Sequence, residues 1–188
     1  MTFVPFLYTV PCGMLELPGL PLSVERCKEW AEHVPLLQES ARCWKGFAVA
    51  ANQVGQPDAF FVLRDYADLD NPALKFESCT EDWPTFVANP KILNESGKQF
   101  GEEGCLSIPH ARPSPGIAFF TAKLSRPNRI HVTYRDREGA PQSIVTTGLL
   151  ARVFCHEIDH LNGVLFTSRL TGKDRERADL NLARLLLT

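Results

Sequence analysis

The sequence predicts an α+β fold, with mixed or antiparallel strands around a central helix and further helices towards both ends of the chain. Apolar residues recur at helical spacing over residues 23–44, 146–161 and 174–188, whereas the middle of the chain carries short apolar or alternating runs. Strands that are grouped in the middle, rather than alternating with helices, favour α+β over βαβ units. The length of 188 residues, without a repeat or a Gly/Ser-rich linker, predicts one domain over residues 1–188.

The first predicted helix covers residues 23–44. Ser23 is a suitable N-cap before the periodic residues, and Pro35 predicts either a kink or the start of a second helix. The apolar stretch "GFAVAANQVG", residues 46–55, follows. After it, "AFFVLR", residues 59–64, predicts a buried strand.

The sequence after residue 65 predicts a loop, several strands and two helices. Residues 65–84 are polar and predict a loop, and "TFVANPKIL", residues 85–93, predicts a strand with a turn at Asn89-Pro90. Residues 129–147 alternate around "DREG" and predict a hairpin. The helix over 146–161 follows, and an amphipathic helix over 174–188 is expected to dock on the protein's own core.

Composition and cysteine spacing limit the function classes. A hydrophobic share of 44% and a net charge of −2 give no electrostatic footprint for nucleic acid or an anionic membrane. No apolar run is long enough to span a bilayer, and no basic residue precedes the apolar N-terminal run, which disfavours a signal peptide. Six irregularly spaced cysteines without C-x-x-C indicate free thiols in a reducing compartment. We therefore expect a cytoplasmic protein, with an organelle as the alternative.

The stretch "VFCHEIDHLNGVLF", residues 153–166, carries the strongest chemical signal. His156 and His160 lie one helical turn apart, on a stripe that Leu149 and Val153 make apolar. Two neutral imidazoles in this arrangement chelate a divalent ion, and Glu157 faces the water that such an ion activates. The H-E-x-x-H pattern thus predicts a metal hydrolase, whereas two histidines hydrogen-bonded in a core are the weaker alternative.

A catalytic metal site needs a third protein ligand. Beyond His160 the acids Asp174, Glu176 and Asp179 lie in a polar tail segment, so the upstream sequence is the better source. "GEEGCLSIP", residues 101–109, places Cys105 in a short apolar stretch that predicts a strand edge. Alone, Cys105 would be read as a buried hydrophobe, but beside H-E-x-x-H it becomes a candidate ligand. A copper site would also want a methionine, and only Met1 and Met14 are present.

Three segments, "GFAVAANQVG", "EGCLS" and "HEIDH", together resemble the signature segments of peptide deformylases. The resemblance runs from about Gly46 to Leu170 in the order and spacing of that family. It implies a peptide-deformylase-like fold in which Cys105, His156 and His160 bind one divalent metal ion. Fe(II) is the first expectation for that ion, and Zn, Ni or Co are the alternatives. The implied reaction removes the N-formyl group from the initiator methionine of nascent polypeptides and releases formate.

The resemblance also implies roles for residues around the metal. Glu157 would take a proton from water and pass it to the leaving amine, while the Gln53 side chain and the Leu106 N–H would bind the oxyanion. Asp159, off the histidine stripe, would support the helix rather than bind metal. Gly46 and Ala48 are implied to contact the substrate through their backbone groups, and Arg112 through its side chain. Phe47 would line the methionine pocket, or it would only pack in the core. N-formylmethionyl peptides are the expected partners, and the ribosome near its peptide exit is a further one.

The chain also departs from the family pattern. Ala48 replaces the second glycine of G-x-G, which predicts either a negative φ or a tighter cleft. Lys45 and Cys155 stand where glutamate and glutamine are common, and a loop over 112–126 looks about nine residues longer than usual. Its Ile117, Phe119 and Phe120 are expected to cover the cleft or a sheet edge. Two alternatives stay open: an H-E-x-x-H peptidase of another family, and a non-catalytic relative that binds peptide or ribosome.

Overall fold

The computed structural model describes residues 7–65, 83–111 and 119–187. Helices and antiparallel strands are mixed as the sequence predicts, and the α+β prediction is confirmed. The helices are α1 (Val24–Ala31), α2 (Val34–Cys43), α3 (Gly148–Leu161) and α4 (Gly172–Leu185), with short 3-10 turns η1 (Gly13–Glu16), η2 (Ala51–Val54) and η5 (Phe166–Arg169). The strands are β1 (Ala48–Ala50), β2 (Phe60–Leu63), β3 (Phe86–Ser96), β4 (Gln99–Pro109), β5 (Phe119–Arg126), β6 (Arg129–Arg135) and β7 (Pro141–Thr147).

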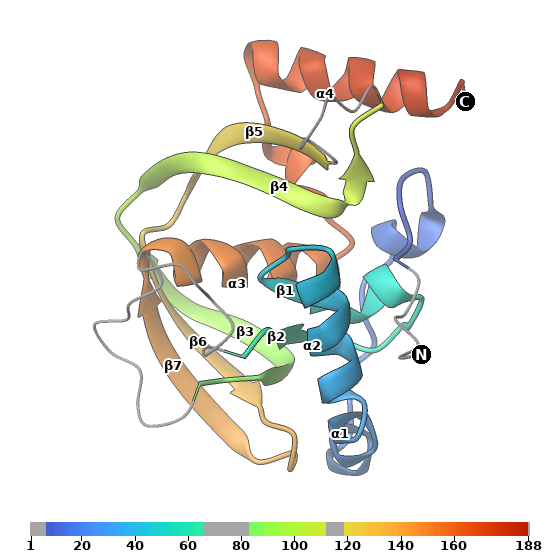
Figure 1. The fold of residues 1–188 in the computed structure, drawn as a ribbon. Coiled ribbons are helices and arrows are strands. Elements are labelled where there is room, and N and C mark those ends of the chain that lie inside the picture. The colour runs from blue at the N-terminus through green and yellow to red at the C-terminus, as the bar shows by residue number, and fades with distance from the viewer. Residues whose placement is uncertain (1–6, 66–82, 112–118, 188) are drawn as a thin grey trace.

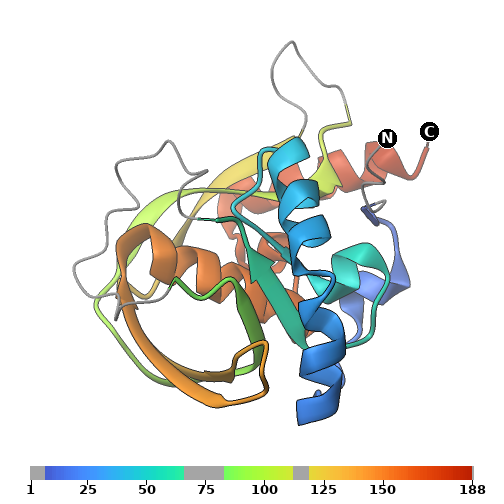
Figure 2. The ribbon, with the colours of Figure 1, turned by 60° about the horizontal axis from the view of Figure 1, so that its bottom comes forward.

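The central helix α3 lies between two antiparallel sheets. One sheet has five strands in the order β1-β2-β3-β6-β7, and the other consists of β4 and β5 alone. Figure 1 shows the five-stranded sheet curving under α3, the β4–β5 hairpin crossing above it, and α4 lying beyond the hairpin. Seen from another side, the curved sheet wraps around one side of α3 (Figure 2). This arrangement places α3 where residues from both sheets can reach it.

The five-stranded sheet is covered on both faces at β2, which explains why this strand is a continuous apolar run. All four residues of β2 are buried. Phe61 packs towards α3, with its ring 5.2 Å from that of Phe154 in an edge-to-face contact, while Phe60 belongs to a cluster with α1 and α2. A strand that is buried on both faces needs apolar residues at every position, as the sequence "FFVL" supplies.

The N-terminal helical pattern is two helices. The Ser23 side chain accepts a hydrogen bond from the N–H of Arg26 and caps α1, as the sequence predicts. Pro35 lies in the first turn of α2, where its missing N–H costs nothing, so the second of the two predicted alternatives is correct.

Two predictions on strands are corrected. The expected turn at Asn89-Pro90 is a bulge inside the long strand β3, with Asn89 at φ 51° and its side chain bonded to both backbone groups of Leu22 at 2.8 Å. The expected loop over 112–126 contains strand β5 from Phe119 onwards, paired with β4 from Gln99 to Gly104. Phe120 is buried in the core under α4 rather than lying over the cleft, and Ile117 is outside the described residues.

The remaining elements follow the sequence. The hairpin over 129–147 is confirmed as β6 and β7, and its turn is held by the Asp136 carboxylate, which accepts from the N–H groups of Glu138 and Ala140. Helix α4 begins at Gly172 and buries only Ala178 and Asn181. The described cysteines are free thiols, and within the described residues no helix is long and apolar enough to cross a membrane.

Candidate metal centre

The three predicted ligands converge in the structure. Cys105 on β4 and His156 and His160 on α3 place their ligand atoms within 4.8 Å of one another, and the Cys105 Sγ lies 3.1 Å from the His160 Nε2. A tetrahedral ion with Zn–S and Zn–N bonds of ordinary length holds its ligand atoms about 3.3 to 3.8 Å apart. The donor set of one thiol and two imidazoles therefore fits a divalent transition metal, and the expected stripe on α3 is correct.

Glu103 orients His156, and the sequence reasoning gave it no role. Its Oε1 accepts a hydrogen bond of 2.7 Å from the His156 Nδ1, which leaves the other ring nitrogen for the metal. Burial would lower the pKa of His156, but contacts with the Cys105 thiol and the Glu103 carboxylate outweigh burial and raise it. A signal was present, because Glu103 is the first residue of the quoted "EGCLS" segment.

A buried ion network extends from Glu103 around α3. Arg126 donates to Glu103 at 2.5 Å and to Asp159 at 2.5 Å, and Arg152 also donates to Glu103 at 3.2 Å. Asp159 accepts a further pair of bonds from Arg169, which agrees with its expected role as a support of α3. Burial would raise the pKa of Glu103, but the hydrogen bonds from His156 and Arg126 lower it to about 2.

Glu157 lines the cleft with a carboxylate that is poorly satisfied by the protein. Within the described residues its Oε2 is buried and has no hydrogen-bond partner. Burial raises the pKa of Glu157 to about 7, against the opposing effect of His156. A buried carboxylate with an open oxygen beside the candidate metal ligands is suited to accepting and returning a proton.

Gln53 is held in one orientation. Its Oε1 accepts from the Ala50 N–H at 2.9 Å, so its amide nitrogen points towards β4, 3.1 Å from the Ser107 Oγ and 3.8 Å from the Cys105 Sγ. The amide nitrogen therefore lies on the side of the candidate metal ligands. Leu106 follows Cys105 directly and lines the same cleft.

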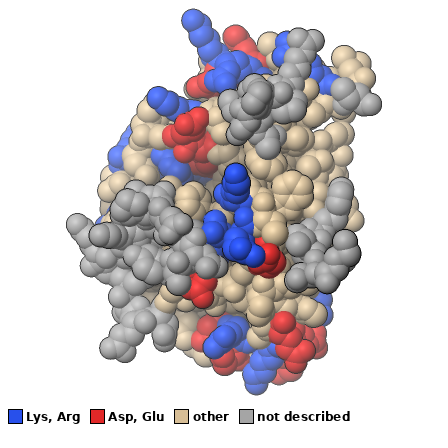
Figure 3. All heavy atoms as spheres, in the orientation of Figure 1, with Lys and Arg blue, Asp and Glu red and all other residues tan. Residues whose placement is uncertain are grey.

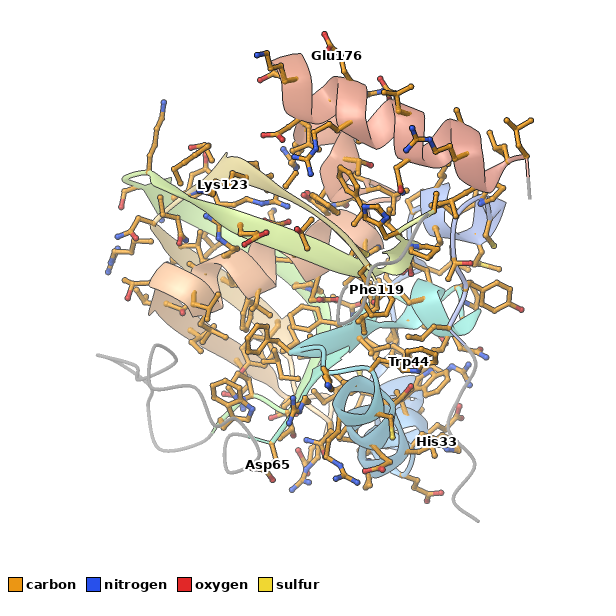
Figure 4. All side chains as sticks on the ribbon, turned by 45° about the horizontal axis from the view of Figure 1, so that its top comes forward. His33, Trp44, Asp65, Phe119, Lys123 and Glu176 are labelled. Carbon is orange, nitrogen blue, oxygen red and sulfur yellow. The ribbon has the colours of Figure 1, made fainter. Side chains whose placement is uncertain are left out.

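The cleft above these residues has a volume of about 660 Å³. Gly46 and Leu106 approach each other across it so closely that a Cβ on Gly46 would lie 2.8 Å from the Leu106 Cδ1. The rings of Trp44 and Phe119, which both line the cleft, meet edge to face with their centroids 6.3 Å apart. Figure 4 labels the two residues near each other. Phe119 lines the cleft, which agrees with the expectation that it covers the cleft, but it lies at the start of a strand and not in a loop.

Of the two residues predicted to bind substrate through their backbone, Ala48 has open backbone groups, whereas the N–H of Gly46 is already used. The Phe47 C=O accepts from the Arg64 N–H, so strand alternation turns the N–H and C=O of Ala48 away from β2 and towards the cleft. The N–H of Gly46 is already bonded to Ala41. Ala48 is in strand conformation rather than at positive φ, which selects the first of the two predicted alternatives. Phe47 also lines the cleft, whereas Arg112 lies outside the described residues.

The downstream acids are elsewhere. Asp174 pairs with Arg177 and Asp179 pairs with Arg175, all on the surface of α4. Glu176, which is labelled in Figure 4, is exposed on the same helix. This arrangement weakens the alternative of an H-E-x-x-H peptidase with a downstream ligand.

Comparisons with known proteins agree with this geometry. The family model described as polypeptide deformylase matches residues 17–176. A peptide deformylase of Thermoanaerobacter pseudethanolicus is 41% identical over 124 residues, which is 66% of this chain and 63% of that protein. One from Thermus thermophilus is 38% identical over 135 residues, 70% of this chain and 65% of that protein. The chain thus spans slightly less than two thirds of the length of these relatives.

Solved structures match over a larger share of the chain. The crystal structure of peptide deformylase from Thermus thermophilus has a TM-score of 0.78 at 30% identity, over 98% of this chain and 96% of that one. The structure from Ehrlichia chaffeensis in complex with actinonin has a TM-score of 0.76 at 30% identity, over 97% and 95%. The two sheets around α3 are therefore a shared architecture.

Proposed function

Because this chain belongs to the polypeptide deformylase family, we propose that it removes the N-formyl group from the initiator methionine of nascent polypeptides and releases formate. The observation that carries the proposal is the convergence of Cys105, His156 and His160 beside Glu157 and Gln53 in one cleft. The proposal treats residues 1–188 as a single metallohydrolase domain.

The thiol of Cys105 and the imidazoles of His156 and His160 would hold one divalent metal ion. When bound, such an ion supplies Lewis-acid activation of water and of the formyl carbonyl. We propose Fe(II) as the ion, with Zn, Ni or Co as alternatives that the same donor set accepts. The Glu103 carboxylate fixes the His156 ring, and the buried network around Glu103 keeps that carboxylate in place.

Glu157 moves the proton in the proposed reaction. Its open oxygen takes a proton from the attacking water, and the same carboxyl group then gives the proton to the leaving amine of methionine. Burial supports this role because a pKa raised towards neutrality lets one group act as base and then as acid near pH 7.

Gln53 and Leu106 would bind the oxygen on which negative charge develops. The amide of Gln53 is oriented before any substrate arrives, because the Ala50 N–H fixes its oxygen. A donor that needs no reorientation stabilises developing charge at no cost at the moment of reaction. The N–H of Leu106 would be the second donor, on the opposite wall of the cleft.

The peptide would bind along the open edge of β1. The outward backbone groups of Ala48 are suited to pairing with an extended chain, and the missing side chain of Gly46 lets Leu106 pack closely beside that edge. Phe47 would line the methionine pocket, and Arg112 would contact the substrate backbone. Actinonin, bound in the Ehrlichia chaffeensis structure, is a corresponding inhibitor candidate here.

The test is formate release from formyl-Met-Ala-Ser by protein purified anaerobically, with bound metal quantified. We expect Glu157→Ala to lose activity by about 10² to 10⁴-fold while it keeps its metal. Cys105→Ala should lose metal and activity together, and Glu176→Ala on the surface of α4 serves as the control that loses neither. A metal-loaded wild type that releases no formate would contradict the proposal and favour a non-catalytic, peptide-binding or ribosome-binding relative.

The cellular setting belongs to the same proposal. Free thiols in the described residues, one of them a metal ligand, suit the reducing cytoplasm. Nascent chains are presented by the ribosome, which is the further proposed partner. Sedimentation of the protein with ribosomes, compared with sedimentation of its metal-free form, tests that association.

A further inference from the structure

Lys45 stands at the rim of the cleft in a backbone conformation that favours glycine. Its φ is 58°, and it follows the last turn of α2. The Lys45 N–H donates to the Arg42 C=O at 3.0 Å and the Gly46 N–H donates to the Ala41 C=O at 2.8 Å. This pair of bonds is a Schellman motif, whose left-handed position is usually glycine. A lysine held there against backbone preference suggests that its side chain has a use.

The charge of Lys45 is available to a ligand. Within the described residues Lys45 forms no ion pair with a carboxylate. Arg152, another cation that lines the cleft, is already paired with Glu103, and the cleft-lining Glu102 accepts from the Thr121 hydroxyl. Figure 3 shows basic side chains gathered in the middle of this face, over the end of α2 and the start of β1.

A peptide that pairs with the edge of β1 in the proposed way would run towards Lys45. At the far end of β1 the Ala50 N–H is bonded to the Gln53 side chain, so an added strand cannot continue past that point. A peptide whose formyl end lies near Gln53 must therefore run back along Ala48 towards α2. Each extended residue advances about 3.3 Å, so the third residue of the peptide lies within reach of the long Lys45 side chain.

We propose that Lys45 determines specificity by favouring formyl peptides with an acidic third residue over those with a basic one. This inference rests on the proposed deformylase function. A glutamate in the peptide would form a partly exposed ion pair with Lys45, whereas a lysine would face a like charge. Such a change alters affinity modestly, so we expect kcat/KM to be about three- to tenfold higher for the glutamate peptide than for the lysine peptide. The preference should appear in KM rather than kcat, because the contact is equal in ground and transition states.

The test compares formyl-Met-Ala-Glu, formyl-Met-Ala-Gln and formyl-Met-Ala-Lys, each as the C-terminal amide to remove the terminal carboxylate. Wild type should prefer them in that order, and the preference should shrink in about 0.5 M NaCl. Lys45→Glu should reverse the order. Lys45→Gly should abolish the charge preference. The variant should fold at least as well as wild type, because glycine is favoured at the positive φ of this position. Lys173→Glu on α4, with the same change in net charge as Lys45→Glu, should leave the preference intact.

The outcomes separate this inference from the proposed function. If wild type releases formate without a charge preference, or if Lys45→Glu and Lys173→Glu shift the order equally, the role of Lys45 is refuted and the deformylase function stands. Calorimetric binding of the same peptides to Glu157→Gln gives a readout without turnover. A Lys45-dependent preference in binding, with no formate released by wild type, would uphold the role of Lys45 in the cleft and reject the proposed reaction.

Discussion

The two sheets contact opposite sides of α3 through different chemistry. The five-stranded sheet meets Leu150 and Phe154 through an apolar cluster, whereas the β4–β5 hairpin meets Arg152 and Asp159 through buried ions. Apolar contact is strong but non-directional, and hydrogen-bonded ions are directional. The larger sheet thus holds α3 through apolar packing, while the hairpin fixes the orientation of the candidate metal ligands.

The largest expected effect comes from Glu103→Ala, which breaks the ionic side of the comparison. The change removes the carboxylate that the buried Arg126 and Arg152 share, and it should lower the free energy of unfolding by about 3 to 5 kcal/mol. It also frees the His156 ring, so metal affinity should fall by about 10- to 100-fold. Urea unfolding and a competition titration with a chelator measure the two quantities. Unchanged metal affinity in the folded variant would show that Glu103 does not orient the ligand.

Phe61→Ala tests the apolar side of the comparison. Removing a fully buried ring that packs against Phe154 should lower the free energy of unfolding by about 3 to 5 kcal/mol. Metal affinity of the folded variant should match wild type, because no ligand or ligand partner is lost. The same two measurements apply. A parallel loss of metal affinity would mean that the sheet also orients the site, and the distinction between the two sheets would be wrong.

The loss of stability at acid pH distinguishes the ionic contact from the apolar contact in metal-free protein. The pKa of Glu103 is lowered from 4.5 to about 2, so its contribution to stability is present above pH 4.5 and is lost as pH falls towards 2. Phe61→Ala should keep this slope at a lower overall stability, whereas Glu103→Gln should flatten it. Urea midpoints from pH 5 to about pH 2.5 make the measurement. Equal slopes in wild type and Glu103→Gln would contradict the expectation.

The smallest effect is expected at the outer end of the ion network. The Arg169 side chain is 48% exposed although its partner Asp159 is buried, so Arg169→Gln should cost about 1 kcal/mol or less. Asp159 keeps its bond from Arg126 in this variant, and metal content should not change. A loss as large as that of Glu103→Ala would show that the network acts as one unit.

The sequence predicted which candidate ligands lie together better than it predicted the elements that carry them. His156 and His160 follow from helical spacing alone, because both lie on one helix. Cys105 was a candidate because the downstream acids were poor ligands, and the resemblance then singled it out, since nothing local links β4 to α3. Glu103 was missed for the same reason: its partners Arg126 and Arg152 come from distant positions, and one chain position cannot reveal a network formed by tertiary packing.

The β5 strand was missed although its pattern was present. Phe120, Ala122 and Leu124 alternate with polar neighbours and are buried, which is the period of a strand. Arg126 continues this inward face as a buried charge, which obscured the pattern, and the Pro-rich sequence before it favoured a loop. At Asn89-Pro90 the turn signal was real, but the side chain of Asn89 bonds to Leu22 and keeps the strand running.

The origin of the three ligands also sets an order of assembly. His156 and His160 come together as soon as one helix forms, whereas Cys105 lies 55 positions before His160 and arrives only when the hairpin has packed. An incompletely folded chain therefore offers two imidazoles and no thiol, a weaker and less selective chelate. If these three residues hold the metal as proposed, tight metal retention becomes a property of correctly assembled molecules alone, and metal content per molecule reports the quality of a preparation.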